Sequence, residues 1–172
     1  MSIIINKSNS FETSIPVVIV GAGACGLTAA LSAREMGVEV LVIEKDASPH
    51  GTTSMSQGTV CAAGTNAQKR AGIEDSPEQF YADVMNKVNY KTDKELVKLV
   101  TTQAGPMIDW ISDNYKIPFS VDTSWKGLGH SVQRLHAPPE KSGEDLLGRL
   151  LQATEEQGVT LITEANVKNL FA

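Results

Sequence analysis

The sequence predicts an α/β fold, in which helices pack on a parallel sheet, from three features of its N-terminal quarter. An apolar, β-branched run over residues 15–20 has the length of a buried strand. Residues 24–36 follow a glycine-rich turn and have the pattern of a helix that ends at Gly37. A second apolar run over residues 38–43 completes a strand–helix–strand unit. Because this unit is the building block of doubly wound sheets, we expect a Rossmann-like fold.

The turn after the first strand, Gly21-Ala22-Gly23-Ala24-Cys25-Gly26, is a G-x-G-x-x-G motif. Its first glycine permits a tight turn, its second lets the backbone approach a pyrophosphate, and its third lets the helix pack closely on the strand. The amides at the start of the helix then face the phosphates. Glu44 ends the second strand 18 positions after Gly26, where its carboxylate can accept hydrogen bonds from ribose hydroxyls. This context predicts a dinucleotide-binding site.

Composition excludes several other classes of protein. The 172 residues are 41% hydrophobic and carry a formal net charge of −5 without a basic run, which fits one globular domain and argues against a nucleic-acid partner. The apolar runs are too short for a membrane span, and the N-terminus lacks the features of a signal peptide. Two cysteines, Cys25 and Cys61, suit neither a disulfide framework nor a metal site. We therefore expect a cytoplasmic protein without a bound metal.

Residues 45–64 form a long segment rich in Gly, Ser and Thr. Such a segment cannot build a core by itself, so it is either a solvated linker or a loop whose amides and hydroxyls face a ligand. We favour the ligand-facing loop, because loops of this length in compact domains are usually functional or disordered.

Helix start and stop signals divide the middle of the chain. Residues 76–78, Ser-Pro-Glu, predict a helix with Ser76 as N-cap that runs to about residue 88. Residues 92–95, Thr-Asp-Lys-Glu, are typical of a capping box that opens a second helix, which Gly105-Pro106 should break or kink. Residues 117–139 show little periodicity and are expected to be irregular or to contain short strands.

The C-terminal part repeats the helix–strand pattern. Ser142 is expected to cap a helix that ends at Gly158, and a strand is expected over residues 159–163. Another strand pattern begins at Val167 and is interrupted at Ala172, which suggests a piece of a longer protein.

The predicted organisation is a flexible leader over residues 1–14 and one incomplete domain over residues 15–172. His130 and His136 are interpreted as hydrogen-bonded structural residues, because acid–base catalysis requires a placed substrate. Three basic side chains are expected to be solvated: Lys126, Arg134 and Lys141.

Three passages resemble the flavoprotein subunit of the fumarate reductase and succinate dehydrogenase superfamily: residues 17–45, residues 62–83, and residues 131–136 with the helix after them. The resemblance covers roughly residues 16–172 and is strongest for the soluble flavocytochrome c-type fumarate reductases. The chain also resembles, less closely, the urocanate reductases and 3-ketosteroid dehydrogenases. The second passage is the most specific one, because the glycine motif also occurs in many other FAD and NAD enzymes.

The resemblance implies bound FAD and, in the full protein, hydride transfer through flavin N5 to or from a carbon–carbon bond next to a carbonyl. It places the diphosphate and ribose against the glycine turn and the end of the second strand, the flavin ring beside the polar loop, and the adenine at one later position. The implied contact residues are Gly21, Gly23, Ala24, Cys25, Gly26, Glu44, Lys45, Thr52, Thr53, Ser54, Gln57, Gly58, Thr59 and Val167.

Departures from the family pattern refine this expectation. In the membrane-bound members a histidine of the loop is linked covalently to the flavin, whereas this chain has Thr52 at the matching place and His50 offset from it. We therefore expect non-covalent FAD. The family's His-Arg-Pro is replaced by His-Ala-Pro at residues 136–138, which changes the surroundings of His136.

The resemblance also implies that the substrate-capping domain and the proton donor lie beyond this chain, so no catalytic residue is assigned and the chain alone is expected to be inactive. The implied partners are FAD, a small unsaturated acid or ketone, and an unidentified electron donor. Two alternatives stay open. An NAD-binding domain would use Glu44 but leaves residues 52–59 without a role. A cofactor-free assembly module would expose apolar surface at its truncated edge and form homo-oligomers.

Overall fold

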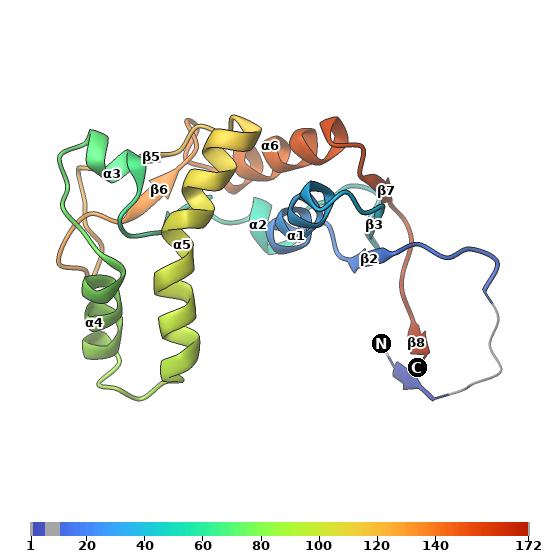
Figure 1. Ribbon diagram of the computed structural model, residues 1–172, viewed down its shortest axis with the longest axis horizontal. Coiled ribbons are helices and arrows are strands. Elements are labelled where there is room, and N and C mark those ends of the chain that lie inside the picture. The colour runs from blue at the N-terminus through green and yellow to red at the C-terminus, as the bar shows by residue number, and fades with distance from the viewer. Residues whose placement is uncertain (1, 6–10, 172) are drawn as a thin grey trace. The chain divides into compact units, whose positions relative to one another are not determined.

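The computed structural model describes residues 2–5 and 11–171 of the chain (Figure 1). The chain divides into two compact units, the first comprising Met1–Met55 with Leu146–Ala172 and the second Ser56–Asp145. Each unit contains a three-stranded sheet and is described by itself. Among the described helices, none has the length and apolar composition needed to cross a membrane.

The first unit is built on the predicted strand–helix–strand pattern. Strand β2 (Val17–Val20), helix α1 (Ala24–Glu35) and strand β3 (Val40–Ile43) follow one another in the chain. Strand β7 (Thr160–Ile162) pairs with β3, and both pairings are parallel, so the sheet order is β2-β3-β7. The predicted α/β fold is therefore confirmed, although each of these strands is shorter than its predicted range.

Helix α6 (Gly143–Glu156) leads into β7. Ser142 Oγ accepts a hydrogen bond from the Asp145 amide at 3.1 Å, so Ser142 caps the helix as predicted. The side chains of Leu146 and Leu150 are buried, in agreement with their spacing on one helix face.

A second strand pair joins the two ends of the described chain. Strand β1 (Ser2–Ile4) pairs in parallel with β8 (Asn169–Phe171), and the rings of Phe11 and Phe171 lie 5.9 Å apart. The first part of the expected leader therefore forms a strand. Residues 1 and 6–10 of that leader lie outside the described residues.

The second unit contains an antiparallel sheet and three helices. The sheet order is β4-β6-β5, and β5 and β6 are the short strands of the segment 117–139. Helix α4 packs against α5. The bounds are β4 (Val60–Cys61), α3 (Asn66–Arg70), α4 (Pro77–Lys87), α5 (Lys94–Tyr115), β5 (Ser120–Val121) and β6 (Leu135–Ala137).

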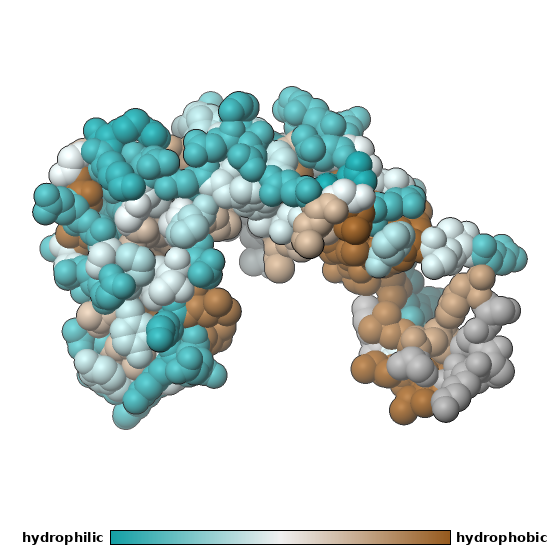
Figure 2. All heavy atoms as spheres, in the orientation of Figure 1, coloured by the Kyte–Doolittle hydropathy of each residue, from teal (hydrophilic) through white to brown (hydrophobic). Residues whose placement is uncertain are grey.

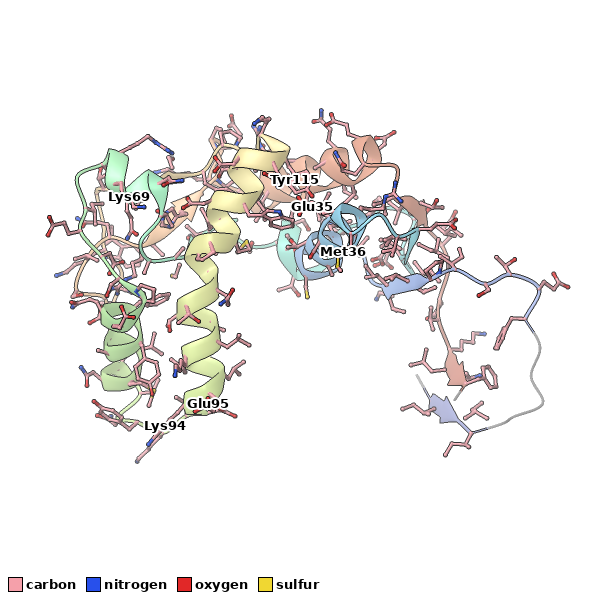
Figure 3. All side chains as sticks on the ribbon, viewed as in Figure 1. Glu35, Met36, Lys69, Lys94, Glu95 and Tyr115 are labelled. Atoms are coloured by element: carbon pink, nitrogen blue, oxygen red, sulfur yellow. The ribbon has the colours of Figure 1, made fainter. Side chains whose placement is uncertain are left out.

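Helix α5 continues through Gly105 and Pro106, so a break at this point is wrong, and the alternative, a kink, stays a prediction (Figure 3 labels Lys94 at its start and Tyr115 at its end). Proline removes one helical hydrogen bond, but packing of the helix on both sides of this point outweighs that loss. The buried residues that provide this packing are Ala104, Ile108 and Ile111.

The capping box predicted at residues 92–95 is also wrong. Asp93, one position later, accepts the hydrogen bond from the Leu96 amide at 3.0 Å and is the N-cap of α5. A capping box instead begins α3, where Thr65 accepts from the Gln68 amide at 3.0 Å and the Thr65 amide donates to Gln68 Oε1 at 3.2 Å.

Arg134 is buried, which contradicts the expectation of a solvated side chain. Its guanidinium donates two hydrogen bonds of 2.7 Å to Asp75 and another to Asp83, and it lies 4.8 Å from the ring centre of Phe80. These partners replace the water that the charge loses. Asp75 and Asp83 are 59 and 51 positions away, so no local sequence pattern indicates the cluster.

The helical glycines Gly105 and Gly148 offer a matched pair of substitutions. A Cβ added to Gly105 would lie 2.2 Å from the Ala63 carbonyl oxygen, whereas at Gly148 it would meet nothing within 4 Å. Gly105→Ala should destabilise the chain by about 2 kcal/mol, because the backbone must shift. Gly148→Ala should stabilise it by up to about 1 kcal/mol, because alanine favours the helix.

Urea unfolding followed by circular dichroism measures both effects. Gly148→Ala controls for the general preference of helices for alanine. Equal stability of the two variants would contradict the close approach of Gly105 to Ala63.

Candidate cofactor site

The glycine turn between β2 and α1 has the shape that its motif predicts. The Gly21 amide donates to the Ile43 carbonyl at 2.8 Å, which ties the turn to β3. Gly21 has a φ of +100°, a conformation that favours glycine. A Cβ on Gly26 would lie 2.0 Å from the Gly21 carbonyl oxygen, so the absence of a side chain lets α1 pack against the turn.

Glu44, at the end of β3, is bonded directly to this turn. It is only 8% exposed, and its Oε2 accepts from the Ala22 amide at 2.9 Å while Oε1 accepts from the Asp46 amide at 3.1 Å. These backbone donors, Ala22 first and Asp46 second, hold the pKa of the Glu44 carboxyl below its ordinary value of 4.5. Glu44 is therefore an ionised acceptor at neutral pH.

The backbone of Glu44 connects β3 to the segment after β7. Its amide donates to the Ile162 carbonyl at 2.8 Å, and its carbonyl accepts from the Ala165 amide at 2.9 Å. Val167, the position expected near the adenine, follows this segment and is partly buried. Glu44 thus contacts two predicted parts of the site, the glycine turn through its carboxylate and the segment before Val167 through its backbone.

A four-residue helix, α2 (Gly51–Ser54), occurs within the loop that was expected to face a ligand. The Ala24 amide in the first turn of α1 donates to Thr53 Oγ1 at 3.0 Å. The N-cap of α1 is Gly23, which has no side chain to accept such a bond, so α2 satisfies an amide of α1. The structure therefore brings together two predicted contact residues, Ala24 and Thr53.

His50 is held by its own short helix. The Ser54 hydroxyl donates to the Gly51 carbonyl at 3.1 Å, and Ser54 Oγ lies 3.0 Å from His50 Nδ1. Ser54 therefore ties the His50 ring to the backbone of α2. The only sequence signal of this contact is the spacing of four positions between His50 and Ser54. Serine occurs at that distance from histidine too often for the spacing to predict the contact.

The other predicted contact residues differ in exposure. Cys25, Lys45 and Thr52 are exposed in the first unit. In the second unit Gly58 is buried, and its neighbours Gln57 and Thr59 are exposed. Over residues 2–5 and 11–171, no three His, Cys, Asp or Glu side chains form a group that could hold a metal ion.

His136 is buried within the second unit, and both of its ring nitrogens are bonded. Nδ1 lies 2.8 Å from the Arg134 carbonyl, which requires a proton on Nδ1, so Nε2 accepts from the Thr65 hydroxyl at 2.7 Å. Burial lowers the pKa of His136, although the hydrogen bond to Arg134 opposes this shift. The imidazole is therefore neutral at pH 7 and links β6 to the start of α3.

The geometry of the first unit is that of a dinucleotide-binding domain, with a glycine turn, a helix that begins directly after it and an ionised Glu44. Residues 16–172 match the family described as FAD binding domain. The chain belongs to this family, so the expected cofactor, FAD, is confirmed.

Within this class the chain is similar to fumarate reductase-type flavoproteins. It is 30% identical over 160 residues to an NADH:fumarate oxidoreductase of Klebsiella pneumoniae, covering 92% of this chain and 17% of that protein. It is 33% identical over 143 residues to a urocanate reductase of Eggerthella lenta, covering 83% of this chain and 23% of that protein. The resemblance inferred from the residues is confirmed.

A solved structure shows the same likeness. The open conformation of a flavocytochrome c3 fumarate reductase has a TM-score of 0.79 to this chain at 28% identity, covering 89% of this chain and 27% of that one. The chain therefore spans between 17% and 27% of the length of these three proteins.

Substitution of Glu44 tests the bond to the glycine turn. A depressed folded-state pKa contributes stability above the unfolded pKa of about 4.5, and this contribution is lost as the pH falls through the folded value. Glu44→Gln should therefore destabilise the chain by about 1–2 kcal/mol at pH 7, because a neutral amide is a weaker acceptor. The difference should shrink as the pH falls below about 4.5.

Urea unfolding of wild type and variant at several pH values measures this difference. Comparison of the two chains cancels the other carboxyl groups, which titrate in both. A difference that stays constant with pH would contradict the ionised Glu44.

Proposed function

We propose that this chain is the FAD-binding part of a flavoprotein oxidoreductase of the fumarate reductase type. The observation that carries the proposal is the buried Glu44 carboxylate bonded to the glycine turn, in a chain of the FAD binding domain family. When bound, FAD supplies hydride transfer between flavin N5 and a carbon–carbon bond next to a carbonyl. The residues of this chain bind and orient the cofactor.

The diphosphate and ribose are assigned to the first unit. The first turn of α1, in which Cys25 is exposed, favours an anion, because its amides and the helix dipole present positive charge. Glu44 is ionised and suits ribose hydroxyls as an acceptor. The residues assigned to these groups are Gly21, Gly23, Ala24, Cys25, Gly26, Glu44 and Lys45.

The polar loop is assigned to the diphosphate and the flavin ring, and Val167 to the adenine. Hydroxyls and amides suit the polar edge of the ring, and glycine permits close approach. The loop residues assigned are Thr52, Thr53, Ser54, Gln57, Gly58 and Thr59.

The FAD is proposed to be non-covalent. Thr52, at the place of the family's linking histidine, has no nucleophilic ring nitrogen. His50, the nearest histidine, is offset from that place by two positions.

The substrate of the whole protein is proposed to be a small unsaturated acid or ketone. Support comes from the names of the relatives, which are a fumarate oxidoreductase and a urocanate reductase. No residue of this chain is assigned as proton donor, the electron donor is unidentified, and the cytoplasmic location stays a sequence-based prediction.

Self-association of this chain is a further part of the proposal. Four strand residues of the first unit are well exposed: Val18, Val20, Leu161 and Ile162. Figure 2 shows apolar surface over the region of β2, β3 and β7. Exposed apolar patches of this kind favour association between copies.

The visible absorption spectrum of the purified chain tests the proposal first. After addition of FAD and removal of the excess, a flavin band should remain with the folded chain. Denaturation and ultrafiltration should then release all of this band into the filtrate, because no covalent bond holds the cofactor.

Titration with NAD is the control for the alternative dinucleotide. Binding of NAD without binding of FAD would overturn the proposal, and a flavin band retained by the denatured chain would contradict non-covalent attachment. The chain with FAD should not reduce fumarate by itself.

Thr53→Val tests the link between α2 and α1. The substitution keeps the shape of the side chain but removes the acceptor of the Ala24 amide, so FAD affinity should fall about five- to tenfold. Thr53→Ser keeps the hydroxyl and should bind FAD within about twofold of wild type. Flavin fluorescence titration measures both, and equal affinities of the two variants would contradict the role of the hydroxyl.

A further inference from the structure

The segment Ser56–Thr59, which we name the flavin loop, is hydrogen-bonded to the first residue of α6. The Gly143 amide donates to the Ser56 carbonyl at 2.9 Å. Ser56 Oγ in turn accepts from the Gly58 amide at 3.0 Å, so the loop is folded on itself. All of these atoms belong to the second unit.

Gly58 makes a second contact with the start of α6, independent of the hydrogen bond between Gly143 and Ser56. Its φ is +63°, and a Cβ at this position would lie 2.4 Å from the Ser142 carbonyl oxygen and 3.1 Å from the Gly143 nitrogen. Both the backbone conformation and the available space therefore require glycine. The loop backbone packs directly on the first peptide of α6.

The residues on either side of Gly58 face solvent. Gln57 and Thr59 are exposed, and no other described residue forms a hydrogen bond with their side chains. The loop therefore combines a backbone that is held at two points with polar side chains that are available to a ligand. A backbone that is ordered before binding lowers the entropic cost of binding.

We infer that the start of α6 is the positioning element of the flavin loop. The Gly143 amide and the Ser142 peptide set the course of residues 56–59, so that Gln57 and Thr59 present their polar atoms to the edge of the flavin ring. This inference rests on the proposed function, which assigns Gln57, Gly58 and Thr59 to FAD.

Substitution of Gly143 can test this inference without disturbing helix α6. It is the first residue of α6, a position where proline is favoured because its missing N–H has no partner within the helix. Gly143→Pro therefore removes the donor to Ser56 and places a ring carbon against that carbonyl. Gly143→Ala keeps the donor and is the matched control.

Ser142→Ala is a second control. It removes the hydroxyl that accepts from the Asp145 amide and so weakens the helix start, but it keeps the Gly143 donor. A loss of FAD affinity that follows helix stability alone would appear in this variant as well. Far-ultraviolet circular dichroism and thermal melts report the helix stability of all three variants.

FAD titration of the complete 172-residue chain, followed by flavin fluorescence and visible circular dichroism, is the test. Gly143→Pro should weaken FAD binding about tenfold and change the visible circular dichroism of the bound flavin. Gly143→Ala and Ser142→Ala should bind within about threefold of wild type with an unchanged spectrum. Equal affinity and spectra in all chains overturn the inference and leave the proposed function intact, whereas no FAD binding by wild type overturns both.

Amide hydrogen exchange of the wild-type chain gives the answer even if Gly143→Pro does not fold. Addition of FAD should slow exchange in the flavin loop and at the Gly143 amide together, because the bound loop holds the Ser56 carbonyl in place. Slower exchange in the loop with unchanged exchange at Gly143 overturns the inference.

Discussion

The hydrogen bond from the Ala22 amide to the Glu44 carboxylate is the interaction on which the candidate site of the first unit depends. It joins the glycine turn to the end of β3, and the backbone of Glu44 carries the connection on to Ile162 and Ala165. Glu44 thus joins three segments that are far apart in the chain, the glycine turn through its ionised side chain and residues 162–165 through its backbone. Its charge strengthens each bond that it accepts, because a carboxylate is a stronger acceptor than a neutral group.

Close backbone approach at glycine recurs in both units. Gly26 packs on the Gly21 carbonyl in the first unit, and Gly105 packs on the Ala63 carbonyl in the second. Gly58 adds a third contact of this kind, against the Ser142 peptide. At each point a side chain would displace backbone rather than another side chain, so the polar main chain can run next to a helix. This property suits a fold that offers backbone amides to a dinucleotide.

Much of the fold could be predicted because its signals are local. The strand–helix–strand pattern, the glycine motif and the caps at Ser76 and Ser142 depend on residues within a few positions of one another. The buried Arg134 and the bond between Ala24 and Thr53 could not be predicted in this way, because their partners are 29 to 59 positions away. The continuation of α5 through Pro106 could not be predicted either, because it depends on packing against residues that are distant in the chain.

The sequence by itself determined the α/β class, the glycine turn, the acidic residue at the strand end and the family to which the chain belongs. The first three follow from spacing along the chain and from the conformations that glycine allows, and the family follows from the resemblance of three passages to known proteins. Only the tertiary structure decided that Glu44 accepts from Ala22, that Thr53 satisfies an amide of α1, and that the Gly143 amide at the start of α6 donates to the Ser56 carbonyl. Such choices depend on which distant donors and acceptors meet when the elements pack, and burial then requires each polar group to find a partner.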